Sequence, residues 1–193
     1  MNKLICLAFI SVLFSCGEKH SAIAVQEEYK SVDKSAVVLI ADKGLVYFED
    51  KLFTGETTRY NQTGDLLESV EYLSGKKSGL YKKWYDDGLL SFQAAYIKGR
   101  RHGTSSSWWN NGNLRSESNY INGIVGGIQT QWYISGVIFK QRNIVNGKEE
   151  GLQQAWRENG KLFANYEVID GRMYGLKRSK LCFELEDEEY NYD

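Results

Sequence analysis

Glycine recurs through this chain with a fixed period of 24 residues, and this repeat restricts the fold more than any other feature. Three sets of glycines follow the period, and the second and third sets lie nine and 20 residues after the first. A fixed period of this kind is typical of proteins in which one small structural unit is stacked many times. The sets are Gly55, Gly79, Gly103, Gly127, Gly151 and Gly175; then Gly64, Gly88, Gly112, Gly136 and Gly160; then Gly75, Gly99, Gly123, Gly147 and Gly171.

Aromatic and apolar residues follow the same lattice. Four of the five tryptophans lie five residues after a first-set glycine, at Trp84, Trp108, Trp132 and Trp156. Within one repeat, positions 1, 3, 5, 11, 13, 15 and 17 after that glycine are taken together apolar in 23 of 35 cases, although position 3 itself is always polar, against 9 of 30 at the interleaved positions. Alternation of this kind is typical of strands with one buried face, whereas an amphipathic helix has a period of about 3.6. Each repeat is therefore predicted to form two β-strands that bury their apolar residues on one shared face.

Turn residues join the predicted strands. Asp87-Gly88, Asn111-Gly112 and Asn159-Gly160 lie between the two strands of their repeats, and such dipeptides accept the positive φ angles of hairpin turns. We interpret all 16 glycines of the lattice as turn residues. A single hairpin cannot bury an apolar face alone, so the predicted fold is all-β, a single elongated stack of antiparallel β-hairpins. The chain has no proline, which agrees with strands that are paired on both sides.

The segments outside the repeats differ from them in composition. Lys177, Arg178 and Lys180 are expected to protect a terminal edge strand, and Glu184 to Glu189 is rich in acidic residues. The predicted organisation is a lipoprotein signal peptide at 1–15, a lipidated N-terminus and flexible tether at 16–36, a capping hairpin at 37–54, five repeats with a C-terminal capping strand at 55–183, and an acidic tail at 184–193.

The N-terminal segment has the features of an export signal. Lys3 provides a positive charge, and a short apolar stretch follows from Leu4 to Leu13. The next residues, Leu13-Phe14-Ser15-Cys16, resemble the lipobox of bacterial lipoproteins, in which the cysteine receives a diacylglyceryl group. The resemblance implies lipidation at Cys16 and a place at the bacterial cell envelope, in the outer membrane, facing the periplasm or the surface. The alternatives are a plain signal peptide and a buried helix with an incidental cysteine.

The repeat itself resembles a known family. The segment from Gly79 to Gly99, with Trp84 and Asp87-Gly88 at their lattice positions, is similar to the bacterial MORN-repeat variant, and Arg157 to Leu162 matches the same pattern. The resemblance covers about residues 44 to 178 and implies stacked β-hairpins with a role in interactions and no assigned catalytic site. Similar proteins are often described as the YwqK-type antitoxin component of toxin–antitoxin systems, while eukaryotic MORN proteins are associated with membrane attachment and scaffolding.

The composition gives little support for catalysis. A net charge of −1 gives no reason to expect a nucleic-acid partner. The two histidines, His20 and His102, have no second ligand at a fixed spacing, so no metal site is predicted. Neither a nucleophile motif nor a phosphate-binding glycine loop is present, so we expect no catalytic residue and no cofactor. An envelope enzyme of unknown chemistry is kept as an alternative.

Two groups of side chains are candidates for binding a partner. Tyr85, Trp109 and Tyr133 lie six residues after the first-set glycine in consecutive repeats, and stacking would align them about 10 Å apart. Rigid aromatic side chains suit a peptide or a glycan, although they could instead cover hairpin ends and stiffen neighbouring strands. Arg100 and Arg101 could meet an acidic surface, or they could be ordinary solvated loop residues.

These patterns together predict a function in recognition. We expect a membrane-anchored module that binds or scaffolds a protein or glycan partner at the bacterial envelope. The alternative is an antitoxin-like protein that binds and neutralises a partner toxin.

Overall fold

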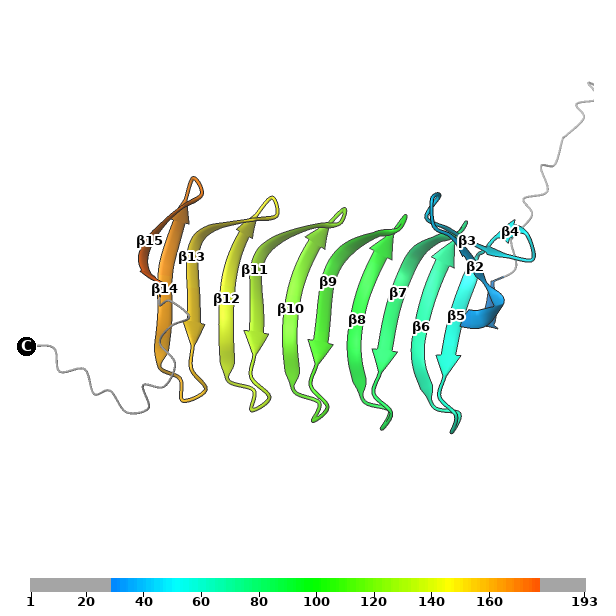
Figure 1. Cartoon of the computed structure of the whole chain (residues 1–193), viewed down its shortest axis with the longest axis horizontal. Coiled ribbons are helices and arrows are strands. Elements are labelled where there is room, and N and C mark those ends of the chain that lie inside the picture. Colours follow the sequence, from blue (N-terminus) through cyan, green and yellow to red (C-terminus); the bar gives the residue numbers. More distant parts are fainter. Residues whose placement is uncertain (1–28, 178–193) are drawn as a thin grey trace, which may run out of the picture.

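A computed structural model describes residues 29–177 and contains one long, open β-sheet. Figure 1 shows its strands lying side by side in one row, with hairpin turns along both long edges. The strands of this sheet are β1 (Lys30–Asp33), β5 (Gly55–Tyr60), β6 (Leu66–Leu73), β7 (Lys76–Trp84), β8 (Leu90–Ile97), β9 (Arg100–Trp108), β10 (Leu114–Ile121), β11 (Ile124–Trp132), β12 (Ile138–Val145), β13 (Lys148–Trp156), β14 (Leu162–Ile169) and β15 (Arg172–Lys177).

The strands follow one another in sequence order. From β6 to β14, each strand pairs antiparallel with the strand before it and the strand after it, and β1 is added beside β5 on the side opposite β6. This order confirms the predicted fold class, an elongated stack of antiparallel hairpins. Successive hairpins are neighbours in space because each second strand pairs with the first strand of the next repeat.

The two long edges of the sheet have different turns. In the two-residue turn between β10 and β11, Asn122 has a φ of 51° and Gly123 a φ of 87°, the type I′ arrangement that matches strand twist. The turns at the other edge are longer. Between β7 and β8 the N–H of Gly88 (φ 83°) donates to the carbonyl of Tyr85 at 3.0 Å, and the carboxylate of Asp87 accepts a main-chain hydrogen bond. The predicted Asp-Gly turn is therefore present, but within this dipeptide only the glycine is left-handed.

The first set of glycines lies inside strands, so the prediction that all 16 lattice glycines are turn residues is wrong for this set. Gly79, with a φ of 104°, lies within β7. Between the pairs Val70–Tyr81 and Tyr72–Lys77, four residue steps in β7 face two steps in β6. Such a bulge requires a backbone conformation that glycine adopts without a steric cost.

A second bulge, beside the tryptophans, changes which side chains share a face. Trp84 pairs with Leu90, but the next pair is Lys83 with Phe92, so Ser91 is an extra residue. One extra residue reverses the alternation of side chains along the rest of the strand. Positions 2 and 4 of a repeat therefore share a face with positions 15 and 13. The predicted single face for positions 1, 3, 13 and 15 is wrong for this reason.

The N-terminal part adds two features to the stack. β1 pairs in parallel with β5, so Lys30 to Asp33 belongs to the sheet, and a short 3₁₀ helix, η1 (Lys34–Ala36), follows it. The predicted tether, 16–36, therefore extends too far. Sequence reasoning missed β1 because its parallel partner lies about 25 residues further along the chain.

The predicted capping hairpin is a small three-stranded sheet, called here the cap, of β2 (Val38–Ile40), β3 (Leu45–Phe48) and β4 (Lys51–Leu52). Main-chain hydrogen bonds attach it to the turn between β6 and β7 of the long sheet. The N–H of Val46 donates to the carbonyl of Gly75 at 2.8 Å, and the N–H of Gly75 donates to the carbonyl of Phe53 at the same distance.

One face of the long sheet, called here the inner face, carries most of its buried apolar side chains. It bears positions 2, 4, 13, 15 and 17 of each repeat. Val70 (2% exposed), Ala94 (1%), Ile144 (6%) and Val168 (4%) lie on it. Phe53, the residue directly after β4 of the cap, packs here too, and its ring centroid is 5.8 Å from that of Tyr72.

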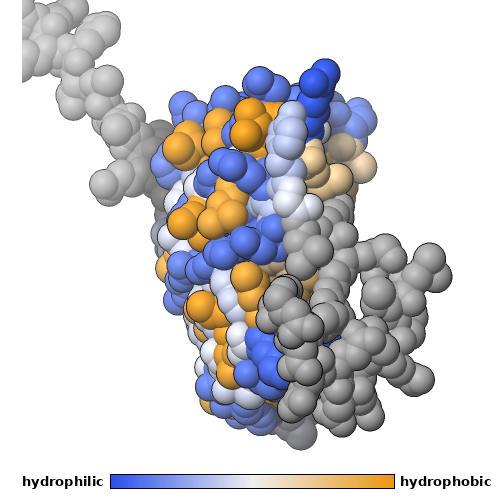
Figure 2. All heavy atoms as spheres, turned by 90° about the vertical axis from the view of Figure 1, so that its left-hand side faces the viewer, coloured by the Kyte–Doolittle hydropathy of each residue, from blue (hydrophilic) through white to orange (hydrophobic). Residues whose placement is uncertain are grey.

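Elsewhere, apolar side chains are dispersed over the surface. Figure 2, seen from the β15 end, shows apolar and polar side chains interspersed, and both Leu152 and Met173 are about half exposed. No helix within residues 29–177 is long and apolar enough to cross a membrane. The predicted signal peptide, Cys16, the residues of the capping strand beyond 177 and the acidic tail lie outside the described residues.

Candidate functional site

The three aromatic residues predicted to form a row each link one repeat to the next. The hydroxyl of Tyr85 donates to the carbonyl of Trp108 at 2.7 Å. The indole N–H of Trp109 and the hydroxyl of Tyr133 make the same hydrogen bond, to the carbonyls of the tryptophans one repeat further on, at 3.1 and 3.0 Å. This geometry gives the row a structural role between repeats. Its use in partner binding stays a prediction.

The row is also packed against its neighbours. The guanidinium of Arg115 lies over the ring of Trp109 at 4.5 Å, and the ring centroids of Tyr133 and Phe139 are 5.1 Å apart. Trp109, Arg115 and Phe139 help line a depression of about 410 Å³ between β9 and β12. The aromatic faces are therefore partly occupied by the protein itself.

The two arginines of the basic pair have different environments. Arg100 is exposed beside its turn, whereas Arg101 is half-buried. Arg101 donates through Nε to the hydroxyl of Tyr96 and through Nη1 to that of Tyr120, both at 3.2 Å. The hydrogen bond with Tyr96, and then the one with Tyr120, raise the pKa of Arg101 above its usual value although burial opposes the shift. Arg101 is thus a positioned cation and not a solvated loop residue.

Arg101 belongs to a continuous row, the tyrosine–cation strip, which consists of Tyr72, Lys77, Tyr96, Arg101 and Tyr120. Tyr72 pairs with Lys77 and Tyr96 with Arg101 on neighbouring strands. The Nζ atom of Lys77 lies 5.4 Å from the ring centroid of Tyr96. Ion pairs in the described part of the chain involve other basic residues, so neither cation of the strip has a carboxylate within 4.0 Å there.

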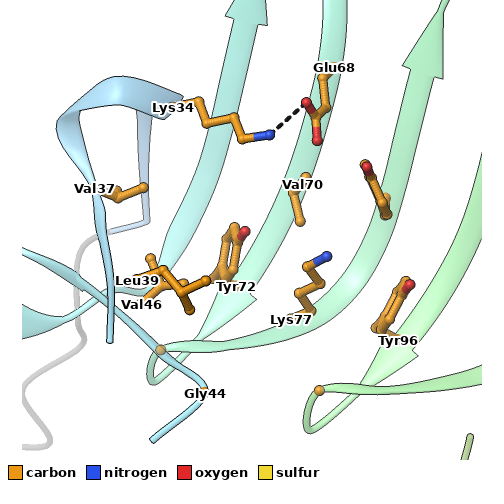
Figure 3. Close-up of a pocket in the computed structure, with 13 residues that line it drawn as sticks. Lys34, Val37, Leu39, Gly44, Val46, Glu68, Val70, Tyr72, Lys77 and Tyr96 are labelled. Atoms are coloured by element: carbon orange, nitrogen blue, oxygen red, sulfur yellow. Dashed lines mark hydrogen bonds and ion pairs between the residues drawn. The ribbon is translucent and has the colours of Figure 1, made fainter. Parts of the chain in front are cut away.

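A cavity of about 460 Å³ lies where the strip meets the cap. Figure 3 shows Tyr72, Lys77 and Tyr96 on the sheet side of this cavity and Leu39 and Val46 on the cap side. The lining combines apolar, aromatic and charged side chains, the usual composition of a ligand pocket.

A buried carboxylate, that of Glu68, lies at one end of this cavity. Its side chain is 7% exposed and accepts from Lys34 Nζ at 2.8 Å and from Arg59 Nε at 3.3 Å. Burial raises the pKa of Glu68, but the hydrogen bonds from Lys34, Tyr81 and Arg59 outweigh it and hold the pKa below its ordinary value. Glu68 and Lys34 also connect η1 to β6, and Figure 3 shows their ion pair as a dashed line.

Tyr81, on β7, also lies at the polar end of the cavity, next to Glu68. Burial, followed by the negative charge of Glu68 and its hydrogen bond with the phenol, raises the pKa of Tyr81 to about 12. The Nζ atom of Lys77 lies 4.6 Å from the centre of the Tyr81 ring. The phenol therefore stays neutral and remains a hydrogen-bonding partner at neutral pH.

Sequence reasoning named Arg101 but missed the strip and the cavity. A signal for the strip was present, since tyrosines recur at position 17 and cations at position 22 of the first repeats. The cavity has no such signal, because the cap that closes it lies outside the repeat lattice. Among residues 29–177, no group of three or more His, Cys, Asp and Glu side chains could hold a metal ion.

Comparison with protein families gives one match. Residues 101–122 match the family model of the MORN repeat variant. The chain carries a MORN repeat. The matched segment covers nearly all of one hairpin, β9 and β10, and its glycine spacing and hairpin geometry recur along the stack, which supports a MORN-repeat protein. No curated protein matched the sequence.

Proposed function

We propose that this MORN-repeat protein is a binding and scaffolding module for a protein or glycan partner at the bacterial envelope. The observation that carries the proposal is Arg101, a cation held between Tyr96 and Tyr120 with no carboxylate partner in the described chain. Arginine and tyrosine are enriched where binding energy is concentrated in interfaces.

The way Arg101 is held favours binding. Two hydrogen bonds to tyrosines, and the Tyr120 ring 5.3 Å from the guanidinium carbon, restrict the side chain before any partner arrives. A side chain that is already ordered loses less entropy when a complex forms. The partner surface that fits the strip is acidic, because Lys77 and Arg101 both carry positive charge.

Photo-cross-linking in intact cells tests this surface. A photoreactive residue at the exposed position Arg100 should capture one specific partner, and Asn110, exposed in a turn at the opposite edge, is the matched control. Arg101→Gln should abolish the adduct formed at position 100, whereas Arg172→Gln, a change at the exposed first residue of β15, should leave it. Identical adducts from positions 100 and 110 would contradict a specific surface.

Membrane attachment is the second part of the proposal. The segment Leu13-Phe14-Ser15-Cys16 supports a lipid anchor at Cys16, with the stack held at the outer membrane. Two or more acyl chains hold a protein on a membrane durably. Cells fed labelled palmitate should label the protein, and Cys16→Ala should remove the label. Label that persists in Cys16→Ala would refute lipidation at this residue.

Cell fractionation separates this function from the antitoxin alternative. A lipid-anchored envelope module is recovered with membranes, whereas an antitoxin-like inhibitor is recovered as a soluble cytoplasmic protein. Recovery of the full chain in the soluble cytoplasmic fraction would therefore favour the alternative.

A further inference from the structure

We infer that the cavity between the cap and the inner face binds the C-terminal end of a partner polypeptide, with its carboxylate on Lys77 and an apolar last side chain against the cap. This inference rests on the proposed function and names the chemistry of one contact. The cavity lies between two separate sheets, which gives it walls that no single hairpin could provide.

The charged residues that line the cavity favour a ligand with a single negative charge. Lys34 and Glu68 form an ion pair at 2.8 Å, so their charges offset each other. Lys77 adds one positive charge, and no carboxylate of the described chain lies within 4.0 Å of it. Its Nζ atom is held above two tyrosine rings, at 4.6 and 5.4 Å from their centroids. A carboxylate entering here would gain a charge-assisted hydrogen bond in a half-buried site.

The cap side of the cavity is apolar and incompletely covered. Val37, Leu39 and Val46 line it, opposite Val70 on the sheet side, and Leu39 is 62% exposed. An apolar side chain placed there would remove Leu39 from water, at about 25 cal/mol for each Å² of apolar surface buried. The ligand is therefore a carboxylate that has an apolar group close to it, as in a chain ending in leucine or valine.

The remaining lining favours a peptide over an acyl chain. Tyr72, Tyr81 and Tyr96 place phenol groups along the sheet side, and the Glu68 carboxylate lies at one end. Tyr81 and Tyr96 already hydrogen-bond to Glu68 and Arg101, but each phenol oxygen can make a further hydrogen bond, and an acyl chain would cover this remaining capacity without satisfying it, at a cost in free energy. The amide groups of a peptide can donate and accept, so a peptide end satisfies both the polar and the apolar walls.

Isothermal calorimetry on the full chain tests the inference with defined probes. Acetyl-Val-Leu with a free carboxylate is the ligand, and the same dipeptide with a C-terminal amide is its neutral counterpart. We expect the acid to bind, and the amide to bind at least about tenfold more weakly, since a hydrogen bond to a charged group is lost. Decanoate, an acid without amide groups, should bind more weakly than the dipeptide acid.

Variants at two adjacent lysines assign the effect to the cavity. Lys77→Met keeps the length of the side chain but removes its charge. It should weaken binding of the dipeptide acid at least about tenfold without changing binding of the amide. Lys77→Arg keeps the positive charge and should therefore bind the acid again. Lys76→Met is the matched control, because Lys76 is exposed and does not line the cavity. Circular dichroism on each variant checks that the sheet is intact.

Several results would overturn the inference. They are no binding of the acid at millimolar concentration, equal binding of acid and amide, unchanged binding in a folded Lys77→Met protein, or tighter binding of decanoate than of the dipeptide. Such a result together with a specific cross-link at position 100 would refute peptide binding in the cavity but would still support the proposed function.

Discussion

The hydroxyl of Tyr85 donates a hydrogen bond to the main-chain carbonyl of Trp108, 23 residues further along the chain, at 2.7 Å. Trp109 and Tyr133 repeat this bond one and two periods later. The bond joins neighbouring hairpins beyond their strand ladder, close to the turn where the ladder ends. Of the two roles that the sequence left open for this row, partner binding or stiffening of neighbouring strands, these bonds support the second, because they connect repeats.

Removing one such bond should lower stability by a modest amount. Tyr133→Phe keeps the ring contact with Phe139 and deletes only the hydroxyl that donates to Trp156, so the free energy of unfolding should fall by about 1 kcal/mol. Urea denaturation measures the change. Tyr60→Phe, at a side chain that is 51% exposed, is the control and should change stability little. Equal losses in both proteins would argue against the bond between repeats.

Substitutions at two adjacent glycines in β11 can distinguish the cost of a strained backbone from the cost of a steric clash. Gly127 has a φ of 72°, and an added Cβ would meet nothing within 4 Å, whereas Gly126 does not have a left-handed φ. Gly127→Ala should therefore cost about 1–2 kcal/mol through the left-handed backbone alone. Gly126→Ala should be close to neutral by the same thermal or urea measurement. A neutral Gly127→Ala would mean that β11 is not bulged at this residue.

The ion pairs of Glu68 predict a loss of stability in acid. Its pKa is lowered in the folded protein, because the hydrogen bonds to Lys34, Tyr81 and Arg59 outweigh the effect of burial. The stabilisation is thus present above the ordinary glutamate pKa, 4.5, and is lost as the pH falls through the lower folded value.

Glu68→Gln should remove this acid-dependent part of the stability, measured by urea denaturation between pH 7 and pH 3. At pH 7 it should cost about 1 kcal/mol, a figure reduced because Lys34 and Arg59 are each 48% exposed. Glu158→Gln removes the same charge from an exposed turn and controls for net charge. An acid profile identical to that of the unmodified protein would refute the role of Glu68.

The phenol of Tyr81 predicts the opposite dependence, in alkali. Its pKa is raised by burial and by Glu68 to about 12, from the usual 10.0, so its contribution is present below pH 10 and is lost as the pH rises towards 12. The difference in phenolate absorbance between the unmodified protein and Tyr81→Phe should show one group with a midpoint near 12. Glu68→Gln should lower this midpoint, because the nearby negative charge is removed. A midpoint near 10 would contradict the buried environment.

The stack of hairpins was predictable because the residues that specify it are close together in the sequence and recur in every repeat. Glycines of the second and third sets mark the turns, and the aromatic positions recur with them, so the hairpins and their order follow from the sequence. Arg101 was also found from the sequence, as one of two adjacent basic residues, Arg100 and Arg101. Its two tyrosine partners were not, because they lie five and 19 residues away on other strands.

The sequence by itself determined a stack of antiparallel hairpins with a 24-residue period, through glycine spacing and strand alternation. Only the tertiary structure decided which side chains share the inner face, because the extra residue at Ser91 and the bulge at Gly79 change the pairing between strands. It also decided that β1 returns to β5 in parallel and that the cap encloses a cavity. These contacts join segments that are distant in the chain and carry no periodic signal in the sequence. They stabilise the protein only after the strands have folded and come together, so the sequence pattern does not reveal them.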